Sequence, residues 1–146
     1  MAPVLHRINN HRLAGYDYSD PSRMVFITLV TKIRAMAPES MVDPAAPFTS
    51  CPPLARQSVE SLHFYRTKGR WQLFAYCVMP DHVHLLCVPS KGMNLSDTLG
   101  FYQRYLTHTA WHYGVVGPLW ERSFYDHVLR AVEAAPRVVE DRQSVV

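Results

Sequence analysis

The sequence lacks any long apolar run and any regular cysteine spacing, and both absences narrow the class of protein. No stretch of about 18 or more consecutive apolar residues occurs, so no membrane-spanning helix is expected. The N-terminal residues contain no apolar core of a secretory signal. Cys51, Cys77 and Cys87 have no disulfide or metal-site spacing. We therefore expect free, buried thiols and a cytoplasmic protein without contact to a membrane.

Internal repeats are also absent, and the composition is that of one globular domain. The chain has 146 residues, of which 48% are hydrophobic and 18% are charged, enough apolar material for one core. We therefore expect a single domain over residues 1–146. The net charge of +3 is compatible with a polyanionic partner but does not by itself require one.

The first half of the chain predicts a strand, a loop and a helix. Residues 23–32 are apolar and β-branched, which indicates a buried strand. Residues 35–53 contain five prolines and are predicted to form a long loop. Apolar residues at helical spacing predict a helix over residues 54–69 that ends at Gly69.

The second half predicts a hairpin, a second helix and a last strand. Residues 71–79 and 82–89 are two strands separated by Pro80 and Asp81, which suit a tight turn. A helix is predicted over residues 94–114, capped by Asn94 or Ser96, and a strand within residues 117–130. The apolar stripe predicted for this helix is Leu95, Leu99, Tyr102, Leu106, Ala110 and Tyr113.

The resulting order, β-α-β-β-α-β, predicts an α+β fold of the ferredoxin-like type. In this topology a four-stranded antiparallel sheet is covered by both helices on one face. The first and third strands are central, and the third is the strand at residues 82–89.

Two histidines interrupt this central strand in the sequence "MPDHVHLL". Strand alternation places His82 and His84 on one face and Val83 and Leu85 on the other. Two neighbouring imidazoles can ligate one divalent ion. The same pattern is also produced by two hydrogen-bonded surface histidines, so the motif alone leaves both interpretations open.

Three blocks of the sequence resemble one known family. They are "RLAGYDYSDPSRMVFITLVTKIR", "FAYCVMPDHVHLL" and "GPLWERSFYDHVLR", in the family's order and spacing. They closely resemble the HUH-type single-tyrosine transposases, in particular the REP-associated tyrosine transposases, over residues 12–130. The resemblance implies an enzyme that cuts single-stranded DNA beside small hairpins and rejoins it. It also implies that His82 and His84 hold one Mg²⁺ or Mn²⁺ on the scissile phosphate.

The resemblance fails where the family has its nucleophilic tyrosine. In such enzymes this tyrosine forms a 5′-phosphotyrosine link, and its position falls near Asp141 in this sequence. A later polar metal ligand falls at Val145, no tyrosine follows Tyr125, and residues 131–146 diverge from the family. Three interpretations stay open: a transposase inactive in cleavage, a hairpin-DNA-binding protein or regulator, or an enzyme with a substitute nucleophile from Tyr102, Tyr105, Tyr113 and Tyr125.

Candidate DNA-contacting residues lie on the second helix and in the last block. Arg104, His108 and His112 share one helical face, which either contacts phosphates or is simply solvated. Trp120 either stacks on an unpaired base or fills the end of the core, and Arg122 lies beside it.

The sequence also bears on another enzyme class with an H-x-H pair and on the oligomeric state. Amidohydrolases also use an H-x-H pair, but on a barrel for which this chain is too short. Relatives in the resembled family are monomers or dimers, so both a monomer and a homodimer are compatible with the sequence.

Overall fold

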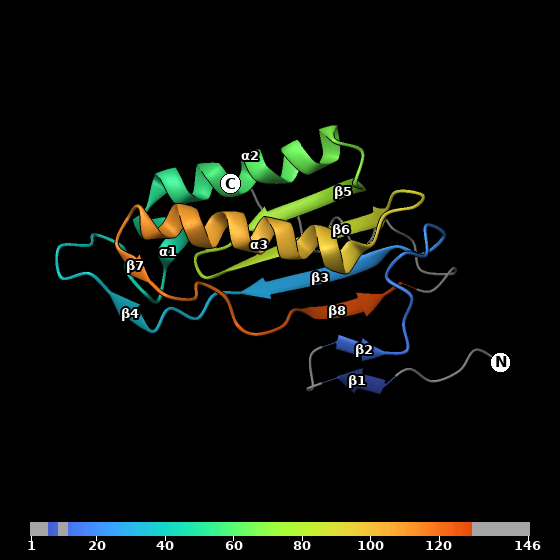
Figure 1. Ribbon diagram of the computed structural model, residues 1–146, viewed down its shortest axis with the longest axis horizontal. Coiled ribbons are helices and arrows are strands. Elements are labelled where there is room, and N and C mark those ends of the chain that lie inside the picture. Colours follow the sequence, from blue (N-terminus) through green and yellow to red (C-terminus); the bar gives the residue numbers. More distant parts are fainter. Residues whose placement is uncertain (1–5, 9–11, 130–146) are drawn as a thin grey trace.

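The computed structural model describes residues 6–8 and 12–129, and it has the predicted α+β architecture (Figure 1). The main sheet has four antiparallel strands in the order β5-β6-β3-β8. These strands are β3 (Val25–Val30), β5 (Trp71–Val78), β6 (His82–Pro89) and β8 (Tyr125–Val128). The two strands predicted to be central, β3 and β6, are central. The ferredoxin-like prediction is therefore confirmed.

Two long helices lie side by side over one face of this sheet, α2 (Pro52–Thr67) and α3 (Leu95–Trp111) (Figure 1). We call this the helix face, and the opposite one, which carries His82 and His84, the histidine face. Alternate residues of β3 point toward the helices and are completely buried: Val25, Ile27 and Leu29. Burial of each of these side chains contributes about 1.5–3 kcal/mol and determines which face of the sheet packs against the helices.

Helix α3 begins and packs as the sequence predicts, but it ends earlier. Asn94 is the N-cap, and its side chain accepts a hydrogen bond from the backbone N–H of Asp97 at 3.1 Å. Five members of the predicted stripe are buried, but Tyr113 is exposed because it lies beyond the helix end at Trp111. Gly114 follows with φ of +98°, a backbone conformation that a helix cannot contain.

The proline-rich segment at 35–53 was predicted to be a loop, and this prediction is wrong in part. It contains β4 (Ala35–Met36), the short helix α1 (Pro47–Ser50) and the first two residues of α2. Pro47, Pro52 and Pro53 are tolerated because they stand at the first positions of helices, where a backbone N–H has no partner within the helix. Pro38 and Pro44 lie in turns outside the helices.

Four short strands complete the described fold. β1 (His6–Ile8) pairs with β2 (Arg12–Ala14), and β4 pairs with β7 (Val115–Val116). Strands of two or three residues are too short to produce a readable alternation, so the sequence did not predict them. In the part of the chain that the structure describes, we find no helix both long enough and apolar enough to span a bilayer.

Candidate metal centre

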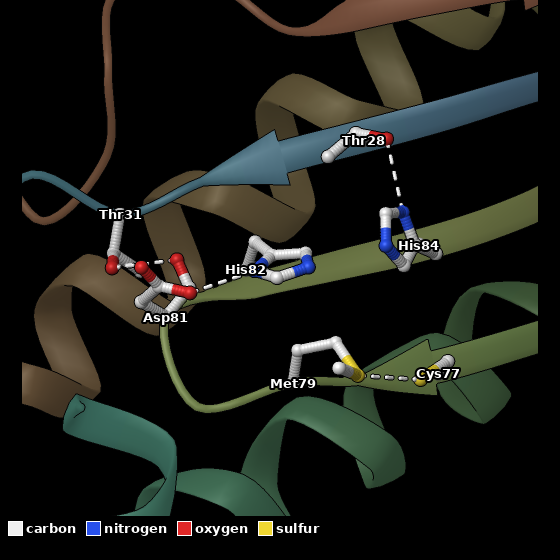
Figure 2. A network of polar contacts seen from close by, with 7 residues as sticks. All are labelled: Thr28, Thr31, Cys77, Met79, Asp81, His82 and His84. Carbon is white, nitrogen blue, oxygen red and sulfur yellow. Dashed lines mark hydrogen bonds and ion pairs between the residues drawn. The ribbon is translucent and has the colours of Figure 1, made fainter. Parts of the chain in front are cut away.

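His82 and His84 project from β6 onto the histidine face, next to each other (Figure 2). Their ring centroids are 4.7 Å apart, with the planes inclined at 77°. Val83 and Leu85, the residues that alternate with them, are completely buried on the helix face. The predicted division of this strand is confirmed, and the packed residues hold the backbone from which the imidazoles project.

Each imidazole is held through the same ring nitrogen. The Nδ1 atom of His82 lies 2.7 Å from Oδ1 of Asp81, and Nδ1 of His84 lies 3.0 Å from Oγ1 of Thr28 (Figure 2). Because a carboxylate only accepts hydrogen bonds, the His82 hydrogen belongs on Nδ1. A metal ion would accordingly be ligated through Nε2 of His82, and through Nε2 of His84 when Nδ1 of His84 donates to the Thr28 hydroxyl. Anchoring one imidazole nitrogen so that the other faces a metal is the usual arrangement in metal sites.

Asp81 is positioned by the turn between β5 and β6. The Thr31 N–H and hydroxyl both donate to the Asp81 carbonyl, at 2.9 and 2.8 Å. The Met79 N–H donates to the His82 carbonyl at 2.7 Å, and the Phe48 N–H of α1 donates to the Pro80 carbonyl at 3.0 Å. The turn is thus tied to the end of β3 and to α1, so the Asp81 side chain starts from a fixed backbone.

The surroundings of His84 are mostly apolar. Phe26 stacks against its ring at 5.3 Å between centroids, and Cys77 is the residue paired with it on β5. Cys77 is buried, and its thiol contacts the Met79 sulfur at 3.1 Å. Apolar surroundings strengthen the interaction of a bound ion with a phosphate, because little water screens it.

Over residues 6–8 and 12–129, no group of three or more His, Cys, Asp or Glu side chains is arranged to hold a metal ion. His82 and His84 are thus two nitrogen donors without a third His, Cys, Asp or Glu ligand among the described residues. Such a pair fits an ion that takes further oxygen ligands from water and phosphate, as Mg²⁺ and Mn²⁺ do in nucleotide sites.

All eight tyrosines lie in the described region, and the sheet places Tyr125 on the histidine face. His84 pairs with Thr28, and Thr28 pairs with Tyr125 on β8. Paired residues of adjacent strands point to the same face, so His84, Thr28 and Tyr125 form a row. With strands about 4.8 Å apart, the Tyr125 and His84 backbones are separated by about 10 Å. The Tyr125 side chain is 38% exposed.

The other tyrosines proposed as substitute nucleophiles lie elsewhere. Tyr102 is completely buried in the core on the helix face, where desolvation raises the pKa of its phenol above the usual range. Tyr105 donates a hydrogen bond to Gln57 across the two helices, at 2.8 Å. Tyr113 lies just beyond the end of α3. The positions Asp141 and Val145 are outside the described residues.

The structure does not bring the predicted DNA-contacting residues to the histidines. Arg104 and His108 are exposed on the outer side of α3, so the helix layer and the sheet separate them from the two histidines of β6. His112 is exposed at the C-cap of the same helix.

Trp120, predicted either to stack on a base or to fill the core, fills the core. Its side chain is only 6% exposed, it contacts Phe48 and Tyr102, and its indole N–H donates to the Gln103 carbonyl at 3.0 Å. Its assignment as a DNA-contacting residue is therefore corrected. Arg122, two residues further on, is exposed.

Two residues of the site escaped the sequence analysis. Asp81 was interpreted as a turn residue only, although its place directly before His82 was a usable signal. Thr28 carried no signal, because its contact with His84 depends on the register between β3 and β6.

Comparison with known proteins shows a likeness in fold. No protein-family model and no curated protein matches the chain. Among solved structures, the chain is similar to a REP-associated tyrosine transposase bound to a REP hairpin, with a TM-score of 0.61 and 16% identity. The match covers 84% of this chain and 66% of that one, so the chain spans just under two thirds of the transposase.

A second solved structure, a candidate transposase from Deinococcus radiodurans R1, is 21% identical, with a TM-score of 0.42. That match covers 87% of this chain and 90% of the other. The likeness to the REP-associated transposase establishes that the chain has the transposase fold.

Proposed function

We propose that this protein is a transposase-like HUH domain that binds single-stranded or hairpin DNA across its histidine face. In this proposal His82 and His84 hold one Mg²⁺ or Mn²⁺ against a backbone phosphate of the DNA. The observation that carries the proposal is the anchoring of both imidazoles through Nδ1, by Asp81 and by Thr28. Two surface histidines without a ligand would not need hydrogen-bond partners at Nδ1 that leave Nε2 of both rings facing away from the anchor.

The likeness in fold supports DNA as the partner. The transposase that shares the fold was solved with a REP hairpin bound. A hairpin presents both paired phosphates and unpaired bases, and a mildly basic chain attracts such a polyanion. When bound, the ion would neutralise phosphate charge and stabilise the five-coordinate transition state of phosphoryl transfer.

The chain's own residues have distinct parts in this reaction. Asp81 and Thr28 orient the imidazoles, and the buried side chains of β6 keep the strand rigid. Tyr125 is the candidate nucleophile, because it is the tyrosine that stands in the same row of the sheet as His84. The Tyr125 side chain is long enough for its hydroxyl to extend past Thr28 toward a phosphate bound at the histidines.

Cleavage by Tyr125 needs no reactant other than the DNA and water. The phenolic oxygen of Tyr125 bonds to the scissile phosphorus, and the bond from phosphorus to the 3′-oxygen breaks with its electron pair. The phenolic proton goes to solvent, and the 3′-oxygen takes a proton from solvent. Rejoining is the reverse reaction, so no ATP is consumed.

A second candidate function is DNA binding without strand transfer. It is favoured by one observation: an aspartate, Asp141, falls near the position where the resembled family has its nucleophilic tyrosine. In that case the histidine face would still hold a metal and a phosphate, but the protein would act as a hairpin-binding regulator.

The test is to incubate the protein with Mn²⁺ and labelled single-stranded DNA that carries the hairpins flanking its own gene. A denaturing protein gel reports covalent linkage, and a native gel reports binding. Mn²⁺-dependent binding with a covalent band supports strand transfer, and the same binding without a band supports the second candidate. Binding that is equal in Mn²⁺ and in EDTA, for wild type and for His84→Ala, would contradict both.

A further inference from the structure

The outer surface of the helix layer carries a groove between α2 and α3. Its volume is about 360 Å³, at the lower end of the range for sites that take small molecules. The residues that line it are Gln57, Glu60, Ser61, Phe64, Tyr65 and Tyr105. We call it the aromatic groove. It lies on the side of the molecule opposite the histidine face.

Large aromatic side chains are exposed in this groove, at Phe64 and Tyr105, and beside it, at Phe101. The exposed fractions are 52% for Phe64, 45% for Tyr105 and 39% for Phe101. Phe101 stacks on Tyr65 with centroids 6.5 Å apart and planes inclined at only 26°. Clustered exposed rings cost solubility, so their presence marks a surface that binds something.

Three cations lie over these same rings. The Lys68 ammonium is 5.4 Å from the Phe64 centroid, and the guanidinium carbons of Arg70 and Arg104 are 4.8 and 5.2 Å from the Phe101 centroid. Within the described region, no carboxylate lies within ion-pair distance of any of the three. Glu60 is the charged residue of the groove lining itself, and the three cations stand beside the groove, over Phe64 and Phe101.

We infer that the aromatic groove binds a single-stranded segment of nucleic acid, with an unpaired base on the exposed rings and the adjoining phosphates at Lys68, Arg70 and Arg104. Rings that offer a flat face and cations without carboxylate partners are what an unpaired nucleotide requires. A protein partner with an apolar face would leave these three charges to be buried without counter-ions, which is costly.

This surface is separate from the proposed metal centre, because the sheet and the helix layer lie between them. Binding at the groove should accordingly need no divalent metal. The inference goes beyond the proposed function, and each can fail without the other.

The experiment measures the affinity of the full-length chain for labelled oligothymidylate by fluorescence anisotropy in EDTA. All groove variants are made in the His82→Ala/His84→Ala double variant, because it lacks the proposed metal centre. Stacking on an aromatic side chain contributes about 1–3 kcal/mol per base, so Phe64→Leu/Phe101→Leu should weaken binding about fivefold or more. Leucine keeps apolar bulk at both positions, and circular dichroism checks that the variant is folded.

A second variant tests the charges independently of the rings. Arg104→Glu should weaken binding and lower the slope of log affinity against log salt by about 0.7, the value for one phosphate contact on a single strand. The matched control is Arg34→Glu, an exposed arginine outside the groove that makes the same change in net charge. It should change affinity much less.

The inference is overturned if the ring variant binds oligothymidylate as tightly as its background protein. It is also overturned if Arg34→Glu and Arg104→Glu have equal effects, because binding would then depend on net charge alone. Concentration-dependent dimerisation that the ring variant abolishes, with oligothymidylate affinity unchanged, would assign the groove to self-association instead.

Discussion

The two faces of β6 show how one strand supports both the core and the candidate site. Val83, Leu85 and Cys87 point to the helices and are completely buried. His82 and His84 alternate with them on the histidine face. Further along that face, Leu86 and Val88 are buried too. The polar character is therefore confined to the hairpin end of the strand, where the turn supplies Asp81, and the rest of β6 is packed on both sides.

This comparison shows that the face of a residue, and not its place in the sequence, decides which property it affects. Neighbours such as His84 and Leu85 should differ sharply when each is changed: one should affect metal and DNA, and the other stability.

The largest effect is expected from Tyr125→Phe on strand transfer. If Tyr125 is the nucleophile, removing its hydroxyl removes the covalent protein–DNA band completely. Stability should change by no more than about 0.5 kcal/mol, because the side chain is at the surface. Denaturing gels with labelled hairpin DNA and Mn²⁺ measure the band, and Tyr113→Phe is the control with another exposed tyrosine. A band of normal intensity in Tyr125→Phe would assign the chemistry to a different residue.

A large effect on stability is expected from Leu85→Ala. Truncating a completely buried leucine costs about 2–5 kcal/mol, through lost burial and the cavity left behind. His84→Ala, one residue away on the other face, should cost less than about 1 kcal/mol in the absence of metal. Urea unfolding of both variants in EDTA measures the difference. Equal losses would mean that the two faces are not energetically distinct.

The sequence predicted the order of the four main strands and the two long helices, the central position of β6 and the division of its residues between the two faces. These follow from alternation and turn chemistry, which are local. Contacts between distant segments were not predictable: Thr28 meets His84 only through strand register, and Trp120 is buried because Phe48 and Tyr102 surround it. Arg104 was interpreted as DNA-facing, although the predicted topology already placed both helices on one face of the sheet, opposite the histidines if Val83 and Leu85 face the helices.

A smaller effect on metal affinity is expected from the residues that orient the imidazoles. Asp81→Ala should weaken Mn²⁺ binding about 10- to 100-fold, because His82 loses the partner that holds its ring. Asp81→Asn should recover part of this loss, since the amide oxygen still accepts a hydrogen bond from Nδ1. Isothermal titration measures both, with Asp97→Asn on the helix side as control. If Asp81→Ala binds as tightly as the control, Asp81 has no orienting role.

A last effect is expected at alkaline pH, and it comes from two tyrosines whose phenols are shielded from water in the folded protein. Burial, with neighbouring carboxylates, raises the pKa of Tyr16 from 10.0 to about 12, and burial raises that of Tyr102 as well. Both folded-state values exceed the unfolded ones, so this stabilisation is complete below about pH 10 and is lost as pH rises through the folded pKa values. The free energy of unfolding should therefore fall between pH 10 and 12.

Urea unfolding across this range checks the prediction. Tyr102→Phe, which removes the ionisable phenol from the core on the helix face, should flatten the decline. A pH profile that is the same in wild type and in Tyr102→Phe would show that the buried phenol does not contribute.

The account depends most on the claim that His82 and His84 together hold a divalent metal ion. Titration of the full-length chain with Mn²⁺, followed by electron paramagnetic resonance, tests it most directly. We predict one bound Mn²⁺ per chain in the wild type, and loss of this binding in both His82→Ala and His84→Ala while the fold is retained. Unchanged Mn²⁺ affinity in both variants would contradict the metal centre and, with it, the proposed function.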